Sequence, residues 1–248
     1  MTPDGRSAIA YWASVSWRRL RFSAATLAVH EPGSPPRCWS RLSRPPEPAF
    51  AGGALAWRVP EVGFSVDGAS QRAAFGLRLV QDPRGTADWE CRACPAGMRF
   101  GIPGGGAVAG LGYAERITFD FPPWALRIQH LRWGRWIAAD GVRSIVWLDW
   151  RGADRLTAVF VDGVRDPSGL VQDEEVRTSD GVLAFAARTT LHARTLHDIV
   201  GRSKPATRVL PTRWLTMEDR KWLSPATLEG AGVEPVTGWA IHEHVRFP

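Results

Sequence analysis

A glutamate lies among apolar residues in the segment 112–121, where alternate residues are hydrophobic. Residues two apart in a strand point to the same side, so Glu115 shares its face with Tyr113, an isoleucine and two phenylalanines. A carboxylate on such a face must be paired, hydrogen-bonded or protonated, because burying an isolated charge is costly. Two interpretations follow: an ion pair with Arg132 or Arg135, or a carboxylic acid that stays neutral near pH 7 and delivers a proton.

The C-terminal segment 237–247 repeats this pattern. Glu243 alternates with apolar residues, while His242 and His244 point to the other side. Glu243 is therefore a second candidate carboxylate, and a paired-carboxylate site is one interpretation of the two strands. Two imidazoles at this spacing also suit a metal site, but the sequence suggests no third ligand, and the pattern favours two solvent-facing histidines.

Tryptophan is unusually frequent. The chain has 13 among 248 residues, and five of them fall within 27 residues: Trp124, Trp133, Trp136, Trp147 and Trp150. Core packing is one explanation, because an indole buries a large apolar area. The other is an aromatic-walled site for an apolar or cationic species, since the face of an indole attracts a cation.

Other motifs give weaker signals. Cys91 and Cys94 form one C-x-x-C motif, with Cys38 as the remaining cysteine. A structural zinc needs about four ligands, and a thioredoxin-like site needs its motif at the start of a helix, so neither is favoured. The glycine-rich residues 103–112 precede a predicted strand, so they lack the helix dipole of a phosphate-binding loop.

The composition is that of a globular protein. With 44% hydrophobic and 23% charged residues, a disordered chain and a coiled coil are excluded, and no stretch approaches the ~20 apolar residues of a membrane helix. The net charge of +6 is spread along the chain, which argues against a nucleic-acid partner. Three cysteines and no secretion signal predict a cytoplasmic protein. Peripheral membrane contact and the oligomeric state stay open.

Short strands must position these residues. Alternating runs bounded by Gly, Pro and Asp predict strands at residues 7–16, 20–29, 54–59, 72–80, 87–91, 112–121, 144–150, 156–161, 181–189 and 237–247. Many short strands at this spacing favour an all-β antiparallel barrel or sandwich.

Helix signals are few. Residues 216–223 predict a short helix with Thr216 as its N-cap. Residues 190–200 are ambiguous between helix and strand, and the proline-rich residues 31–48 predict an extended loop.

The most specific pattern lies in residues 110–150, which contain G-L-G-Y-A-E, P-P-W, L-R-W-G-R-W and S-I-V-W-L-D-W. This segment resembles the lipocalin-like superfamily of the bacterial carotenoid hydratases (hydroxyneurosporene synthase type) and related natural-product cyclases. Two glycines and Tyr113 match the family's G-x-G-Y-x-D segment, with Glu115 in place of its Asp. Trp133 and Arg135 match its later aromatic run, although this chain is much shorter than the hydratases. The resemblance implies a lipocalin-like fold of two packed β units, residues 1–108 and 109–248, with few short helices.

The resemblance also implies a reaction. Glu115 would donate a proton to an alkene of an isoprenoid or polyene, and Tyr113 would hydrogen-bond it or orient water. Hydration or cyclisation would follow, with no metal and no cofactor. The residues expected to bind the substrate and stabilise a carbocation are Trp89, Trp124, Trp133, Trp147, Arg135 and Glu243. The alternatives are a non-catalytic lipocalin-like binder of an apolar small molecule and a pericyclase or isomerase on the same fold.

Overall fold

The structure is a computed structural model that describes residues 2, 5–17, 20–42, 44–200, 210–230 and 234–247. Strands dominate these residues, and the helical segments among them are short: η1 (Pro123–Ala125), α1 (Leu196–Val200) and α3 (Thr212–Leu215). The predicted all-β fold is confirmed. None of the helices in the described part of the chain is long and apolar enough to span a membrane.

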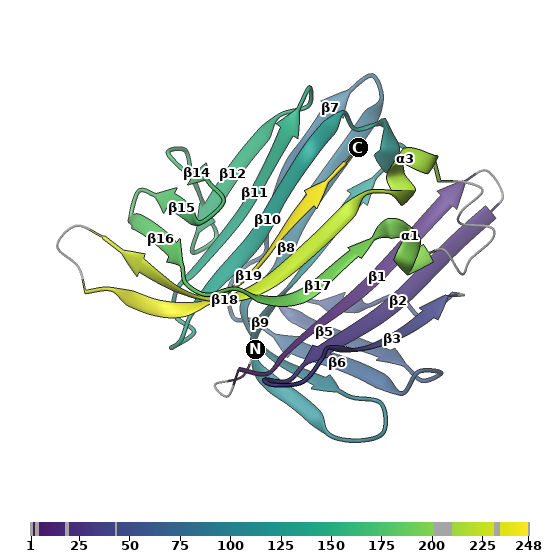
Figure 1. Cartoon of the computed structure of the whole chain (residues 1–248), viewed down its shortest axis with the longest axis horizontal. Coiled ribbons are helices and arrows are strands. Elements are labelled where there is room, and N and C mark those ends of the chain that lie inside the picture. The colour runs from purple at the N-terminus through teal and green to yellow at the C-terminus, as the bar shows by residue number, and fades with distance from the viewer. Residues whose placement is uncertain are drawn as a thin grey trace. The chain divides into compact units, whose positions relative to one another are not determined.

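The described strands form three sheets (Figure 1). The first contains, in order, β1 (Ser7–Trp17), β2 (Leu20–His30) and β3 (Arg37–Leu42). The six-stranded sheet has the order β4 (Ala49–Ala51), β5 (Ala54–Val59), β6 (Phe64–Ala69), β8 (Gly85–Gly101) and β7 (Phe75–Asp82), with β9 (Ala107–Phe119) also paired to β8.

The ten-stranded sheet supplies most of the residues discussed below. Its order is β13 (Val164–Asp166), β12 (Leu156–Val161), β11 (Ser144–Gly152), β10 (Ile128–Ala138), β19 (Val236–Arg246), β18 (Glu218–Glu229), β16 (Gly181–Phe185), β15 (Glu175–Thr178) and β14 (Leu170–Val171), with β17 (Thr189–Thr195) also paired to β18. The neighbouring strands in it are antiparallel, and β11, β10, β19 and β18 are long and adjacent in Figure 1.

The chain divides into two compact units. The first contains Met1–Ala74 and Cys91–Arg116, and the second contains Phe75–Glu90 and Ile117–Pro248. The long strands β8 and β9 therefore each contribute residues to both units. The boundary expected between residues 108 and 109 stays a prediction.

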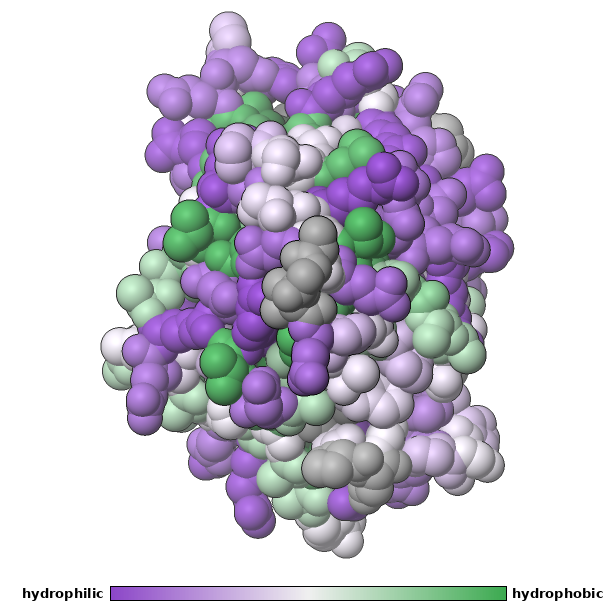
Figure 2. All heavy atoms as spheres, turned by 90° about the vertical axis from the view of Figure 1, so that its left-hand side faces the viewer, coloured by the Kyte–Doolittle hydropathy of each residue, from purple (hydrophilic) through white to green (hydrophobic). Residues whose placement is uncertain are grey.

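Each unit has its own apolar core. In the first, strands β2, β5 and β6 contribute alternate residues, as the strict alternation of burial along β5 shows. In the second, Trp136, Ile145 and Trp147 pack with Leu183 and other apolar residues. Strand β10 from Trp133 to Ala138 and strand β11 from Ser144 to Trp150 are buried on both faces, which explains their nearly continuous apolar sequence. The molecular face drawn in Figure 2 is mainly hydrophilic, with separated apolar groups.

Two local predictions need correction, and one ambiguity is resolved. Residues 216–223 do not form a helix, because Glu218 begins strand β18, which pairs with β17 and β19. The segment 190–200 is a strand to Thr195 and a helix from Leu196, so both interpretations hold in part. The proline-rich segment 31–48 contains strand β3, because the run between its proline clusters can pair with β2.

Candidate active site

Five neighbouring strands place one residue each in a row across the ten-stranded sheet. Leu148, Trp133, Glu243, Lys221 and His192 are successive cross-strand partners from β11 to β17. Directly opposed residues in antiparallel strands share a face, with Cβ atoms about 5 Å apart. The side of the sheet that carries this row is referred to below as the Trp133 face.

The adjacent row on the same face contains Trp150, Leu131, Val245 and Asp219, again as successive partners. Asp219 and Lys221 are two residues apart in β18, so their side chains point to the same side. Register alone therefore brings one lysine and two carboxylates together from strands β18 and β19.

The side chains in this cluster are in direct contact. The Nζ of Lys221 donates hydrogen bonds to both carboxylate oxygens of Asp219, each at 2.7 Å, and to the Oε2 of Glu243. The Nε2 of His192 lies 3.8 Å from the Oδ2 of Asp219. The exposed side-chain fraction is 8% for Lys221, 12% for Asp219, 16% for Glu243 and 17% for His192, so the cluster is buried but not sealed.

The electrostatics of this arrangement favour an exchangeable proton. One ammonium faces two carboxylates, and burial disfavours the residual negative charge. Burial raises the pKa of Asp219 to about 6, assisted by the charge of Glu243 and opposed by Lys221. Burial and Lys221 lower the pKa of His192 to about 4, so its imidazole is neutral near pH 7.

Aromatic rings adjoin the cluster. Trp133 is the cross-strand partner of Glu243, and its ring lies 6.4 Å from that of Trp89 in an edge-on arrangement. The ring of Trp89 also contacts Phe75 at 5.8 Å and Phe160 at 5.5 Å. Trp89 has no exposed surface, and Trp133 is 8% exposed. A desolvated acid–base group and indole faces therefore lie side by side within the second unit.

Arg135 belongs to the Trp133 face as well, since it follows Trp133 by two residues in β10, and it is buried. Trp147 does not belong to it: Trp147 is the partner of Gly134 and lies on the opposite face. There its ring stacks on Phe185 at 5.5 Å. The structure thus separates Trp147 from Trp133, although both were predicted to bind substrate.

The prediction that His242 faces solvent is wrong. His242 is 6% exposed, because its strand β19 lies between β10 and β18. Its ring stacks on Phe185 at 4.6 Å, and its Nε2 lies 3.0 Å from the hydroxyl of Ser224. Burial lowers the pKa of His242 to about 3. His244 contacts a histidine of β10 instead: its Nε2 is 3.1 Å from the Nδ1 of His130.

Trp124 lies in the short helix η1, which two arginines hold. Arg213 donates to the carbonyl of Trp124 at 3.0 Å, and Arg84 donates to the carbonyl of Ala125 at 3.0 Å. Trp124 is half-buried, and the main chain around it is fixed from two separate segments.

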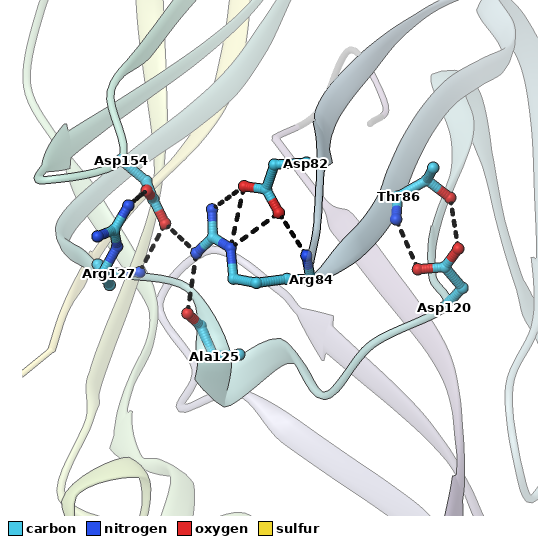
Figure 3. A network of polar contacts seen from close by, with 7 residues as sticks. All are labelled: Asp82, Arg84, Thr86, Asp120, Ala125, Arg127 and Asp154. Atoms are coloured by element: carbon cyan, nitrogen blue, oxygen red, sulfur yellow. Dashed lines mark hydrogen bonds and ion pairs between the residues drawn. The ribbon is translucent and has the colours of Figure 1, made fainter.

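A charged network surrounds Arg84 (Figure 3). The guanidinium of Arg84 donates hydrogen bonds to Asp82 and, at 2.7 Å, to Asp154. Arg127 also donates to Asp154, through its main-chain N–H and its guanidinium. Burial is the largest single effect on Asp154 and by itself would raise its pKa. The hydrogen bonds from Arg84 and Arg127 together outweigh burial, so the pKa of Asp154 is lowered. The network therefore has a structural role at the turn between β7 and β8.

Glu115 and Tyr113 are half-buried residues of β9 in the part of that strand that belongs to the first unit. Their roles as proton donor and partner stay predictions. Cys91 and Cys94 are buried in β8. Among the described residues, no group of three or more His, Cys, Asp or Glu side chains is arranged to hold a metal ion.

An open hollow of about 500 Å³ lies elsewhere in the second unit. All its lining residues are polar: Arg151, Gln172, Asp173, Glu174, Glu175 and Arg177. Several of their charges are already paired, including Arg177 with Glu175 at 2.7 Å. This lining does not suit an apolar substrate, so the Trp133 face is the stronger candidate.

Sequence reasoning found three residues of this face, Trp133, Arg135 and Glu243, and also Trp89 of β8, whose ring packs against Trp133. It missed Asp219, Lys221 and His192, because the helix assigned to residues 216–223 hid the alternation along β18. One signal was available, since Lys221 is one of only two lysines in a chain with 31 Lys and Arg residues.

No protein-family model and no curated protein sequence matches this chain. Solved structures of other proteins do match it. Kievitone hydratase from Nectria haematococca matches with a TM-score of 0.57 and 8% identity over 97% of this chain and 84% of that chain. A Nitrosomonas europaea protein provisionally named AttH matches with a TM-score of 0.56 and 10% identity over 97% and 88%. CghA bound to Sch210972 matches with a TM-score of 0.51 and 12% identity over 91% and 84%. At these identities the likeness shows a shared fold, in agreement with the lipocalin-like fold that the sequence resemblance implied.

Proposed function

We propose that this chain is an enzyme that hydrates or cyclises an alkene of an apolar small molecule by proton transfer, without a cofactor. Its acid–base centre would be the cluster of Asp219, Lys221 and Glu243 on the Trp133 face. One observation carries the proposal: a buried ammonium between two carboxylates, with a pKa near 6 for Asp219, lies directly beside Trp133. The shared fold with a hydratase structure supports it.

The protonated carboxyl of Asp219 begins the reaction. Its O–H bond breaks as a C–H bond forms on the alkene, which leaves a carbocation on the neighbouring carbon. The ammonium of Lys221 stabilises the resulting carboxylate, because their atoms are already hydrogen-bonded. A group with a pKa near the working pH is an effective proton donor, since it is both available in acid form and able to release its proton.

The carbocation would be held by indole faces. Trp133 lies next to Glu243 in the row, and Trp89 packs against Trp133, so the electron-rich rings adjoin the cluster that contains the acid. Water then adds to the cation in a hydration, and neutral His192 accepts the proton that the water loses. The proton returns to Asp219, 3.8 Å away, so alkene and water give an alcohol with every group restored. In a cyclisation, a second alkene replaces water as the nucleophile, and the cyclised cation then loses a proton from a neighbouring carbon to the carboxylate of Asp219, which forms a new alkene and restores the acid.

Glu115, the acid expected from the sequence, can be tested separately from Asp219. It lies on β9 in the first unit, and Asp219 lies in the second. Variants therefore discriminate between the two carboxyl groups. The role of Tyr113 is tested together with that of Glu115, because Tyr113 is expected to hydrogen-bond that carboxyl or to orient water.

The test uses a panel of linear terpenoids and polyenes, with products analysed by mass spectrometry and chromatography. Gain of one water indicates a hydratase, and an unchanged mass with a new retention time indicates a cyclase or isomerase. Asp219→Asn should lower turnover by about 100-fold or more, as expected for loss of a general acid. Glu218→Gln is the control, because Glu218 is the neighbour of Asp219 in the same strand and its side chain is 47% exposed; this variant should keep full turnover.

Two outcomes would contradict the proposal. Full turnover in Asp219→Asn with loss of turnover in Glu115→Gln would assign the acid to the first unit. Tight binding of panel members without any conversion would make the chain a non-catalytic binder.

A further inference from the structure

The indole of Trp150 has a polar atom that finds no partner in the part of the chain that the structure describes. Trp150 is 4% exposed, and its Nε1–H has no hydrogen-bond acceptor among the described residues. Other indoles of the chain have one: Trp57 donates to the carbonyl of Pro46 at 2.7 Å, and Trp136 to that of Ala226 at 3.2 Å. Buried donors are almost always paired, because leaving one unpaired loses its interaction with water without replacement.

Trp150 lies on the Trp133 face, in the same row as Asp219. Leu131 and Val245 stand between them, and Leu148 and Trp133 occupy the neighbouring row. Strands in a sheet are about 4.8 Å apart, so the Cα atoms of Trp150 and Asp219 are separated by three steps, roughly 14 Å. The face thus has an acid near one end, an apolar middle, and an unpaired N–H donor near the other.

The chemistry of the donor limits what can pair with it. An indole N–H is a neutral donor and cannot offset a negative charge. A carboxylate or phosphate placed among Leu131, Leu148 and Val245 would remain a buried charge, which is costly. A neutral acceptor with two lone pairs, such as a ketone, suits the position.

We infer that the substrate of the Trp133 face is an oxygenated apolar molecule whose neutral oxygen accepts a hydrogen bond from the Nε1–H of Trp150 while its alkene lies beside Asp219. This inference rests on the proposed function and narrows its substrate class. A hydrocarbon isoprenoid leaves the donor unpaired and binds more weakly. Oxygen and alkene are on the order of 10 Å apart, since both side chains extend from the sheet toward the ligand.

Two probes of equal carbon skeleton test this. Geranylacetone carries a ketone at one end and a trisubstituted alkene at the other, and the matched hydrocarbon has a methylene in place of the carbonyl. Binding is followed by the indole N–H resonances of nitrogen-15-labelled protein, with the Trp150 signal identified by its loss in Trp150→Phe. We expect the ketone to shift that signal downfield and to bind roughly tenfold more tightly than the hydrocarbon, the equivalent of one hydrogen bond.

Variants complete the test. Trp150→Phe should remove the preference for the ketone, and both probes should then bind equally. Trp12→Phe is the matched control, because the indole of Trp12 already donates to the carbonyl of Pro45, and it should keep the preference. The measurement on the unsubstituted protein does not depend on how well a variant folds.

The inference is overturned if the two probes bind the unsubstituted protein equally, if the ketone does not bind, or if it binds without moving the Trp150 signal. Its failure is distinct from failure of the proposed function. A non-catalytic binder would still show the ketone preference, whereas an enzyme acting on hydrocarbons would lose turnover in Asp219→Asn and show no such preference.

Discussion

Replacement of Lys221 by Met tests whether the acid–base cluster is electrostatically coupled as its geometry indicates. Methionine keeps most of the length and apolar volume of the lysine stem but removes the ammonium that bonds Asp219 and Glu243. Two buried carboxylates then face each other without that cation. Breaking a buried ion pair in this way destabilises a protein by about 3–5 kcal/mol.

The penalty should depend on pH, because the carboxylates can escape it by binding protons. A carboxyl whose folded pKa is raised stabilises the folded state fully below its unfolded pKa, and this stability is lost as pH rises through the folded pKa. For Asp219 the window runs from 3.8 to about 6 in the native protein. Loss of Lys221 raises the folded pKa further and so extends this pH window upward. Above pH 6 the difference in unfolding free energy between variant and native protein therefore grows by about 1.4 kcal/mol per pH unit for each proton bound.

Urea unfolding followed by tryptophan fluorescence measures this difference at about pH 5.5 and about pH 8. We expect Lys221→Met to be several kcal/mol less stable than the native protein at the higher pH and much closer to it at the lower one. Arg220→Met is the control, since Arg220 is exposed and pairs only loosely with Glu218, at 3.5 Å. It should cost less than about 1 kcal/mol at both pH values.

A pH-independent cost in Lys221→Met would refute the reasoning. It would mean that the two carboxylates are solvated well enough to stay ionised without the ammonium, and that the raised pKa of Asp219 has no energetic consequence. A cost no larger than that of Arg220→Met would lead to the same conclusion.

Three further predictions follow from the same sheet. A carboxyl carbon resonance of the native protein should titrate near pH 6 and disappear in Asp219→Asn; titration of every carboxyl below pH 5 would contradict a raised pKa of about 6. The pKa of His242 is lowered to about 3, so the stabilising effect of the neutral imidazole is present above pH 6.5 and is lost as pH falls toward 3. In thermal unfolding across this range, the double variant His242→Phe/Ser224→Ala should therefore lose less stability than the native protein. An identical pH profile of the two proteins would contradict this prediction. Gly134→Ala should cost about 1–3 kcal/mol in urea unfolding, because its Cβ would overlap the Trp147 ring and lie 2.7 Å from the Cβ of His242, whereas Gly97→Ala, with nothing within 4 Å of the added carbon, should have little effect; equal costs would show that packing at Gly134 is not tight.

Local sequence patterns were sufficient to predict the all-β class and most strands. Alternation is a local property, and segments such as 144–150 and 54–59 are apolar or alternating enough to predict the strands that the structure contains. The sequence also indicated Trp133 and Glu243, because an indole excess and a carboxylate among apolar residues can be recognised without knowing any neighbour.

Which of these residues come into contact depends on how the strands pair. In β18 the buried positions near the start of the strand belong to Asp219 and Lys221, so the local pattern showed no apolar face and predicted a helix. Lys221 offsets the charge of Asp219 within β18, and Glu243 arrives from β19, 22 positions along the chain, to accept a further hydrogen bond from Lys221. The added negative charge of Glu243 helps raise the pKa of Asp219, an effect that β18 alone does not show. Trp147 and Trp133 likewise look equivalent along the chain, and cross-strand register alone puts them on opposite faces of the sheet. The physical reason is that charge pairing and register are set by hydrogen bonding between distant strands, which no single segment encodes.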